Sequence, residues 1–211
     1  MGPFLVVDDH SMVREGLGRM LATEFPGSVI RYAASRQAAL EAVVERFFLL
    51  AVLDISMPGG NGLGLIPEIR DRSPRTRILV HTMHPEDPFG YQALRSGADG
   101  FITKDAPVEQ ILLAVRKILH GGRFVSAALA EVLAGAVVTG VGGGAESLSD
   151  REFQILRLIT SGKTPTEIAD DLGLSVKTVS TYRTRILEKL HLRTTAEMIR
   201  FGIRHNLDGP D

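Results

Sequence analysis

Five side chains in the first half of the chain are of types that handle metal ions and phosphoryl groups. They are three carboxylates, a hydroxyl and an ammonium: Asp8, Asp9, Asp54, Thr82 and Lys104. Crowded carboxylates are costly unless a cation lies among them, and such oxygen ligands suit Mg²⁺, which takes few protein carboxylates and keeps several waters. A hydroxyl and an ammonium beside them would suit a phosphoryl group whose oxygens need neutralising. If the five converge, they predict a Mg²⁺-assisted phosphoryl site.

Each of these residues follows or ends a predicted strand. Over residues 1–120, short apolar runs alternate with longer stretches of helical spacing. The apolar runs are Phe4–Val7, Val29–Ala33, Leu49–Leu53, Ile78–Val80 and Gly100–Thr103. This alternation predicts an α/β fold with a parallel sheet covered by helices on both faces. Because ligands bind at the carboxyl ends of strands in such sheets, we expect the five side chains to share one edge.

Taken singly, each residue also has an ordinary structural explanation. An acidic pair after a strand can cap the next helix, although Ser11 also fits that role. Asp54 could be a turn residue before Pro58, Thr82 a strand end, and Lys104 a surface lysine. Five such residues at one predicted sheet edge favour the functional interpretation.

A glycine-rich break precedes an all-helical second half. Gly140–Ala145 predicts a flexible linker, and a short helix is expected near 126–134. Four further helices are predicted near 150–161, 165–172, 176–190 and 194–205. We therefore expect an α/β domain at 1–120, a linker with a short helix at 121–146, and an all-α domain at 147–211.

The second-half helices follow the pattern of a helix-turn-helix. Gly173 can end one helix in a left-handed conformation, and Ser175 can start the next. Val179, Ile186 and Leu190 repeat at helical spacing and should face inward. The polar face is then Lys177, Ser180, Thr181, Thr184 and Arg185. A helix, a short glycine turn and a second helix with small polar and basic residues are typical of DNA-binding domains, although a generic helical hairpin shares this topology.

Charge distribution helps to separate these two possibilities. The whole chain has 24 Lys plus Arg, 25 Asp plus Glu and a formal charge of −1, which by itself argues against nucleic acid. Between Leu172 and His205, however, seven basic residues stand against two acidic ones. Because phosphate contacts dominate nucleic-acid affinity, this clustering favours DNA binding. The near-neutral total predicts modest affinity for a monomer, so dimerisation should matter.

The composition narrows the remaining classes. The absence of Cys excludes a disulfide scaffold, a Cys-ligated metal site and a Cys nucleophile. No apolar run approaches the ~20 residues of a membrane-spanning helix, and the first residues lack the basic and apolar regions of a signal peptide. We therefore expect a cytoplasmic protein with no membrane partner.

The acidic pocket resembles the receiver domain of two-component response regulators, over about residues 1–120. The matching positions are Asp8-Asp9, Asp54, Thr82 and Lys104. The resemblance implies a (βα)5 flavodoxin-like fold in which Asp54 accepts a phosphoryl group from a sensor histidine kinase. It also implies that Asp9, Asp54 and the backbone carbonyl of Ser56 hold Mg²⁺, and that Asp8 assists through water.

The same resemblance assigns roles around the phosphoryl group. Lys104 would pair with it, and Thr82 would move toward it on activation. Phe101 matches the aromatic position that rotates with the threonine, but it could equally be a core residue. His84 stands where the family tunes hydrolysis of the acyl phosphate.

Residues 147–207 resemble the helix-turn-helix domain of the LuxR class. The matching runs are Leu148-Ser149-Asp150-Arg151-Glu152, Glu167-Ile168-Ala169, Leu174-Ser175, Lys177-Thr178-Val179 and Lys189-Leu190. The resemblance implies base contacts from Ser180, Thr181 and Thr184. It implies phosphate contacts from Lys177, Thr178, Tyr182, Arg183 and Lys189. Because small hydroxyl side chains discriminate bases less than a bidentate Arg does, DNA shape should contribute to sequence preference.

Together, the two halves resemble a NarL/FixJ-type response regulator, and the run Lys177–Tyr182 is most similar to the BvgA/EvgA branch. This resemblance implies a transcriptional regulator rather than an enzyme. It would bind double-stranded promoter DNA, as a homodimer when phosphorylated. Met198, Ile199 and Phe201 could form the dimer contact or belong to the domain core.

Two alternatives to phosphorylation-controlled DNA binding remain at the level of sequence. The first is a phosphorylation-independent DNA-binding regulator, although the complete set of five pocket residues argues against it. The second is a Mg²⁺-dependent phosphatase. It is disfavoured because Ser56 stands where that chemistry needs a second acidic residue.

Overall fold

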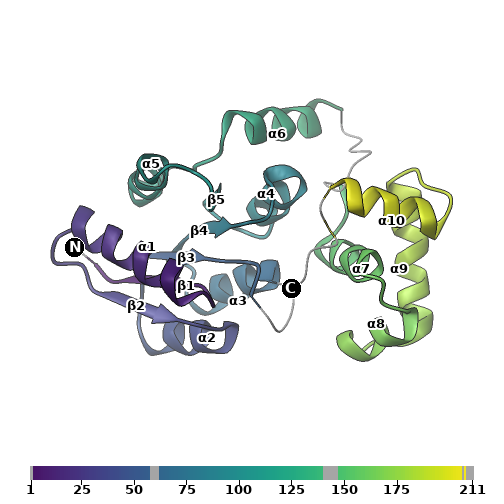
Figure 1. Cartoon of the computed structure of the whole chain (residues 1–211), viewed down its shortest axis with the longest axis horizontal. Helices are drawn as coiled ribbons and strands as arrows, with labels where there is room; N and C mark the ends of the chain where they lie inside the picture. The colour runs from purple at the N-terminus through teal and green to yellow at the C-terminus, as the bar shows by residue number, and fades with distance from the viewer. Residues whose placement is uncertain (1, 58–61, 140–146, 206, 208–211) are drawn as a thin grey trace. The chain divides into compact units, whose positions relative to one another are not determined.

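A computed structural model describes residues 2–57, 62–139, 147–205 and 207, and Figure 1 shows the elements along the chain. The chain forms two compact units that divide between Ala130 and Glu131. The predicted linker at Gly140–Ala145 lies outside the described residues. Within the described ranges, no helix combines the length and apolarity needed to cross a membrane.

The first unit is built around a five-stranded parallel sheet, with strand order β2-β1-β3-β4-β5. The strands are β1 (Phe4–Val7), β2 (Ile30–Ala33), β3 (Leu50–Leu53), β4 (Arg77–Thr82) and β5 (Gly100–Thr103). This order is the flavodoxin-like one and confirms the predicted fold. Strand β4 continues past Val80 because His81 and Thr82 still pair with β5, opposite Ile102 and Thr103.

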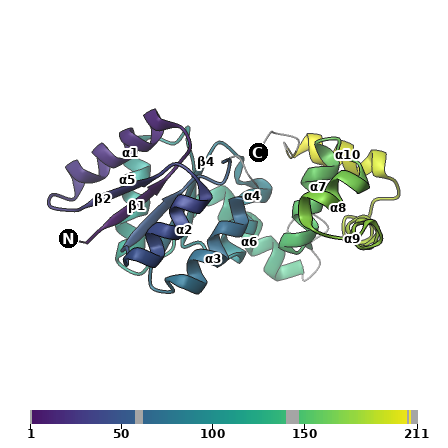
Figure 2. The ribbon, with the colours of Figure 1, turned by 90° about the horizontal axis from the view of Figure 1, so that it is seen from below.

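Helices cover both faces of this sheet, as a buried parallel sheet requires (Figure 2). Helices α1 (Ser11–Glu24) and α5 (Val108–Leu119) pack on one face, where their apolar stripes join buried residues of the strands in one core. The other face carries α2 (Arg36–Glu45), α3 (Leu65–Arg72) and α4 (Glu86–Arg95), and a 3-10 turn at Gly62–Gly64 precedes α3. The layers therefore leave the two ends of the sheet as the places where strand-end residues can gather.

The turn between β1 and α1 differs from the prediction that Ser11 could cap the helix. The N-cap residue is His10, and Ser11 is already the first helical residue. The carboxylate of Asp8 accepts a hydrogen bond from the backbone N–H of His10 at 2.8 Å. The acidic pair therefore organises this turn itself.

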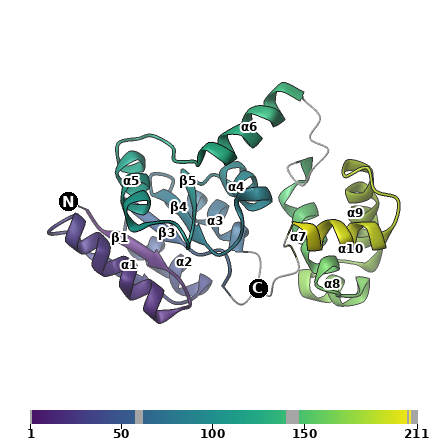
Figure 3. The same ribbon diagram turned by 45° about the horizontal axis from the view of Figure 1, so that its top comes forward.

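The second unit contains four short helices, visible in Figure 3. They are α7 (Asp150–Thr160), α8 (Pro165–Leu172), α9 (Val176–Lys189) and α10 (Thr195–Arg204). Capping boxes start the first two: Ser149 pairs with Glu152, and Thr164 pairs with Glu167. Gly173 has φ +62° and ends α8, as predicted, because a left-handed residue suits glycine.

Helix α6 (Ala127–Thr139) precedes these four and is longer than the predicted helix near 126–134. The alanine-rich apolar run continues past Gly135, and a single glycine inside a helix is tolerated at modest cost.

The sequence left open whether Met198 forms a dimer contact or belongs to the domain core, and its burial decides for the core. Met198 of α10 is fully buried within the unit, where α10 packs on α7. Met198 is therefore a core residue of the domain, whereas Ile199 and Phe201 are only half-buried.

Candidate functional site

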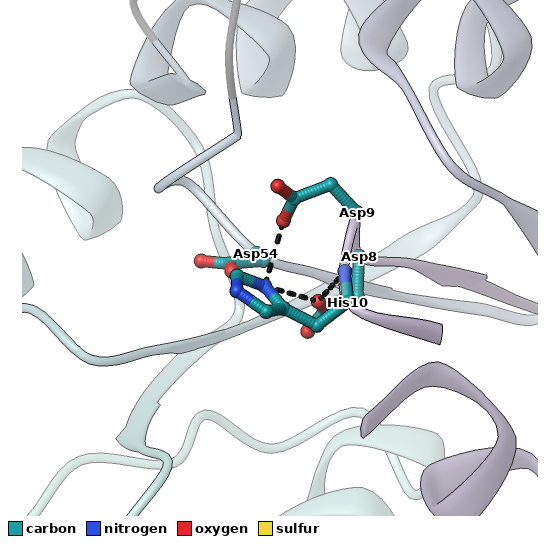
Figure 4. Close-up of side chains that lie close together, drawn as sticks. All are labelled: Asp8, Asp9, His10 and Asp54. Atoms are coloured by element: carbon teal, nitrogen blue, oxygen red, sulfur yellow. Dashed lines mark hydrogen bonds and ion pairs between the residues drawn. The ribbon is translucent and has the colours of Figure 1, made fainter. Parts of the chain in front are cut away.

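An acidic cluster forms where β1 and β3 end. Asp8 and Asp9 follow β1, and Asp54 follows β3, which pairs with β1 in parallel register. One possible ligand atom from each of Asp8, Asp9, His10 and Asp54 lies within 4.8 Å of the others, and Figure 4 shows these side chains turned toward one another. Asp8 and Asp54 are buried, and Asp9 is half-exposed. The predicted convergence of the three carboxylates is therefore present.

Lys104 reaches the same cluster from the loop after β5. Its Nζ lies 2.6 Å from Oδ2 of Asp54 and 2.7 Å from Oδ2 of Asp8. Because all three side chains are largely buried, the ammonium holds the two carboxylates together with little solvent screening. Lys104 thus contacts two of the three carboxylates of the cluster.

The hydroxyl side of the pocket connects Asp54 to Thr82 through Ser56. The backbone N–H of Ser56 donates to Oδ1 of Asp54 at 2.8 Å, and the Ser56 hydroxyl lies 2.8 Å from the Thr82 hydroxyl. The Thr82 hydroxyl also accepts a weaker hydrogen bond from the backbone N–H of His84, at 3.3 Å. Two hydrogen bonds, to the Ser56 hydroxyl and from the His84 amide, therefore hold Thr82 beside the Asp54 site. A rotation of the Thr82 side chain would break both.

The protonation states of the central pair follow from this geometry. Burial raises the pKa of Asp54, but the hydrogen bonds from Lys104, Ser56 and Thr82 and the charge of Lys104 outweigh it, so the pKa lies below its usual value. Burial lowers the pKa of Lys104, but Asp54 and Asp8 outweigh it, so that pKa is raised. At neutral pH the pocket therefore presents an ionised carboxylate beside a charged ammonium.

Phe101 and His84, the two aromatic residues that the resemblance assigns to the phosphoryl site, are both buried. Phe101 on β5 is fully buried, as either of its predicted roles allows. His84 is buried and stacks on Phe89 of α4, with ring centroids 4.0 Å apart. The loop after β4 is thus packed against α4.

The sequence interpretation missed two residues of the pocket. His10 places Nδ1 2.9 Å from Oδ1 of Asp9 and 3.4 Å from Oδ1 of Asp8, while its side chain stays 65% exposed. Its position directly after the acidic pair was the available signal. Arg14 donates to the backbone carbonyls of Asp8 at 2.5 Å and Asp9 at 3.3 Å. This contact fixes the acidic loop on the first turns of α1, and only the folded structure shows it.

His81 should make the stability of the first unit depend on pH. It is 4% exposed, and neither ring nitrogen has a hydrogen-bond partner among the described residues. Burial, aided by the charge of Lys104 and opposed by Asp8 and Asp54, lowers its pKa from 6.5 to about 4. Between about pH 6.5 and 4 the unfolded chain therefore binds a proton that the folded chain does not. Stability should fall across this window as pH drops, by up to about 3 kcal/mol at ~1.36 kcal/mol per pKa unit.

The substitution His81→Leu should remove this part of the pH dependence. Urea unfolding of the first unit at several pH values between 4 and 6.5 measures it, with the exposed-histidine variant His120→Gln as the control. An undiminished slope in His81→Leu would show that another group titrates.

The polar face predicted for the helix near 176–190 is exposed on α9. Val179, Ile186 and Leu190 are buried, as expected. The exposed residues are Lys177, Ser180, Thr181, Thr184 and Arg185, while Thr178, Tyr182 and Arg183 are half-buried. The helix therefore presents hydroxyl and cationic side chains together along one accessible side.

The hydroxyls of this face keep the capacity to accept hydrogen bonds. Thr181 donates to the Lys177 carbonyl at 3.0 Å, and Thr184 donates to the Ser180 carbonyl at 3.2 Å. A hydroxyl that donates once still has lone pairs, so base-edge donors could be read here. The guanidinium of Arg185 lies 5.9 Å from the centre of the Tyr182 ring.

Lys189, which was predicted to contact a phosphate, forms an ion pair within the domain that the sequence did not predict. Its Nζ lies 2.6 Å from Oε2 of Glu152, the buried acid of the α7 capping box. Burial raises the pKa of Glu152, but Lys189 and Ser149 outweigh it and hold that pKa below its usual value. Lys189 therefore ties the end of α9 to the start of α7, and a phosphate contact would have to share this ammonium.

Comparison with known proteins agrees with this pair of sites. Residues 4–116 match the family model described as the response regulator receiver domain. The chain belongs to the response regulators. Residues 146–201 match the model described as bacterial regulatory proteins of the luxR family, so the second unit is a LuxR-type DNA-binding domain. The response regulator is a transcription regulator and not an enzyme.

Curated relatives match this response regulator over nearly its whole length. It is 34% identical to the oxygen regulatory protein NreC of Staphylococcus carnosus, covering 96% of this chain and 97% of that protein. It is 37% identical to the transcriptional activator protein ExaE of Pseudomonas putida, covering 96% of each. Neither relative tests the BvgA/EvgA assignment, which stays a prediction.

A solved structure supports the fold. RcsB from Salmonella enterica serovar Typhimurium, bound to promoter rprA in the presence of the phosphomimetic BeF₃⁻, superposes with a TM-score of 0.75. It is 24% identical and covers 94% of this chain and 96% of that one.

Proposed function

We propose that phosphoryl transfer from a sensor histidine kinase to Asp54 controls promoter binding by this response regulator in the cytoplasm. The observation that carries the proposal is the ionised Asp54 carboxylate, held between Lys104 and the Ser56 amide at the carboxyl end of β3. An ionised oxygen is the nucleophilic form of a carboxylate. Asp9 and Asp8 stand close enough to complete a phosphoryl site.

Mg²⁺ is the cofactor that this pocket fits. Three carboxylates meet in this pocket, and the ammonium of Lys104 neutralises only part of their charge. One divalent cation would offset the excess negative charge. Asp9, Asp54 and the backbone carbonyl of Ser56 would hold the ion, and Asp8 would assist through water. When bound, the ion would supply positive charge to the phosphoryl oxygens.

The protein's own residues carry the transfer. A carboxylate oxygen of Asp54 forms a bond to the phosphorus of the donor phosphohistidine, the P–N bond breaks, and the histidine nitrogen leaves with the electron pair. Lys104, now within reach of the new phosphoryl oxygens, would exchange part of its contact with Asp54 for them. Thr82 would leave Ser56 and donate its hydroxyl to the phosphoryl group. Loss of this partly buried hydrogen bond is the local event that biases a two-state receiver.

The DNA-binding role rests on the exposed face of α9. Ser180, Thr181 and Thr184 would read bases, and Lys177, Thr178, Tyr182, Arg183 and Lys189 would contact phosphates. A homodimer would place two such helices on paired half-sites. RcsB, whose fold this chain shares, is bound to promoter rprA in the presence of the phosphomimetic BeF₃⁻.

A phosphodonor titration that follows DNA affinity and molecular mass together tests this proposal. We expect affinity for a selected promoter site and the dimer fraction to rise in parallel with the phosphorylated fraction. Because the effect is a population shift, the gain in affinity should be about 5- to 150-fold. Typical coupling free energies between two sites give changes in affinity of this size. Equal affinity with and without the donor would instead favour the phosphorylation-independent alternative.

A further inference from the structure

A pocket lies at the end of the receiver sheet opposite Asp54. Its volume is about 340 Å³, and its walls come from the amino ends of β1, β3 and β4 and the carboxyl ends of α1 and α5. Along β1, Phe4 at the pocket is four residues from Asp8, or roughly 13 Å at ~3.3 Å per residue. A molecule bound here would therefore not touch the phosphoryl site.

The floor of this pocket is apolar. Phe4 and Phe25 belong to the buried core and meet edge to face, with ring centroids 5.4 Å apart. Leu49 and Leu119 add half-buried aliphatic walls. Apolar side chains that line a concave site favour the apolar body of a ligand over water.

Three arginines surround this apolar floor, and two of them already have acidic partners. Arg77 lies 2.8 Å from Oδ1 of Asp99, and the Nε of Arg116 lies 2.8 Å from Oε1 of Glu24. Asp99 is also shared with Arg70 from α3. The carboxylates of Asp99 and Glu24 are therefore already shared among Arg77, Arg116 and Arg70. Neither of these pairs includes Arg75, the third arginine of the pocket.

That third arginine, Arg75, has an exposed guanidinium stacked 5.2 Å from the centre of the Phe47 ring. Phe47 does not line the pocket, and a cation–π contact leaves the charge and the N–H donors of the Arg75 guanidinium available. The rim of the pocket therefore carries an excess positive charge beside an apolar floor.

We propose that this pocket binds a small amphipathic carboxylate. Its apolar body would lie against the half-buried Leu49 and Leu119, next to the buried Phe4 and Phe25, and its carboxylate would meet Arg75. A guanidinium suits this partner because its parallel N–H groups match the two oxygens of a carboxylate. The volume falls at the small end of the range for small-molecule sites, ~300–1,000 Å³, and favours a molecule over a protein segment. This site does not depend on phosphorylation of Asp54.

Isothermal titration calorimetry on the full chain with octanoate as the probe tests the proposal. Acetate keeps the carboxylate and lacks the apolar body, while 1-octanol keeps the body and lacks the charge. We expect saturable octanoate binding at one site per chain and at least about tenfold weaker binding of each truncated probe. Arg75→Gln should weaken octanoate by a similar factor, because it removes a charge-assisted contact.

The control variant is Arg19→Gln, which changes an exposed arginine on α1 that pairs with Glu15. It should leave octanoate binding unchanged. Because Arg75 is exposed, its replacement should not unfold the chain, and labelling of the same sample by a phosphodonor checks this. Octanoate affinity that is unchanged in Arg75→Gln, 1-octanol binding as tight as octanoate, or the absence of saturable binding would each overturn the proposal.

Discussion

The substitution Asp54→Asn is expected to abolish labelling of the chain by acetyl phosphate or by a phosphorylated kinase. The carboxamide is nearly the same size as the carboxylate but is not a nucleophile at neutral pH, so no acyl phosphate can form. The fold should persist, because Lys104 keeps its second partner, Asp8, at 2.7 Å. Phosphate incorporation, followed by intact-protein mass and by peptide mapping, measures the result.

Asp71→Asn is the matched control, since it makes the same chemical change at an exposed acid of α3. It should label at the wild-type rate. Asp9→Asn gives a second comparison. It leaves the nucleophile intact while removing a proposed Mg²⁺ ligand, so labelling should slow strongly but stay on Asp54. Wild-type labelling in Asp54→Asn, or a label on another residue, would refute the site.

The sequence was sufficient to predict the sheet and the convergence at its carboxyl edge. Apolar runs such as Leu50–Leu53 are buried between helix layers, so their composition alone marks them as strands. Once the strands run parallel, the residues after β1, β3 and β5 share one edge. Asp8, Asp54 and Lys104 meet there for that reason.

What the sequence could not predict depends on packing between distant segments. The half-buried Arg77 begins β4 because Leu50 of β3 pairs with it, and no apolar pattern marks that start. Lys189 meets Glu152, 37 residues away, because α9 packs on α7. Helical spacing predicts which face of α9 is buried, but it does not identify the residue opposite.

The second large effect is expected on α9, where Lys177 and Thr181 should separate affinity from sequence preference. Lys177 is exposed near the start of the helix. Lys177→Ala should weaken binding several-fold to every DNA sequence and reduce the slope of log affinity against log salt by about one. Thr181→Ala should leave that slope unchanged and flatten discrimination at one base pair. That loss should stay below the ~1–3 kcal/mol of a bidentate contact, because a hydroxyl makes a single contact.

Fluorescence anisotropy over a series of salt concentrations, with a selected site and its single-base variants, distinguishes these two effects. Lys117→Ala, which changes an exposed lysine of α5 in the receiver, is the control and should alter neither slope nor preference. The two readouts are independent, since phosphate contacts fix affinity and register while base-edge contacts carry sequence information. If both α9 variants bind as wild type does, DNA must lie on another face of the second unit. If Thr181→Ala instead weakens binding equally to every sequence, this threonine contacts the phosphate backbone, and sequence preference must come from Ser180, Thr184 or DNA shape.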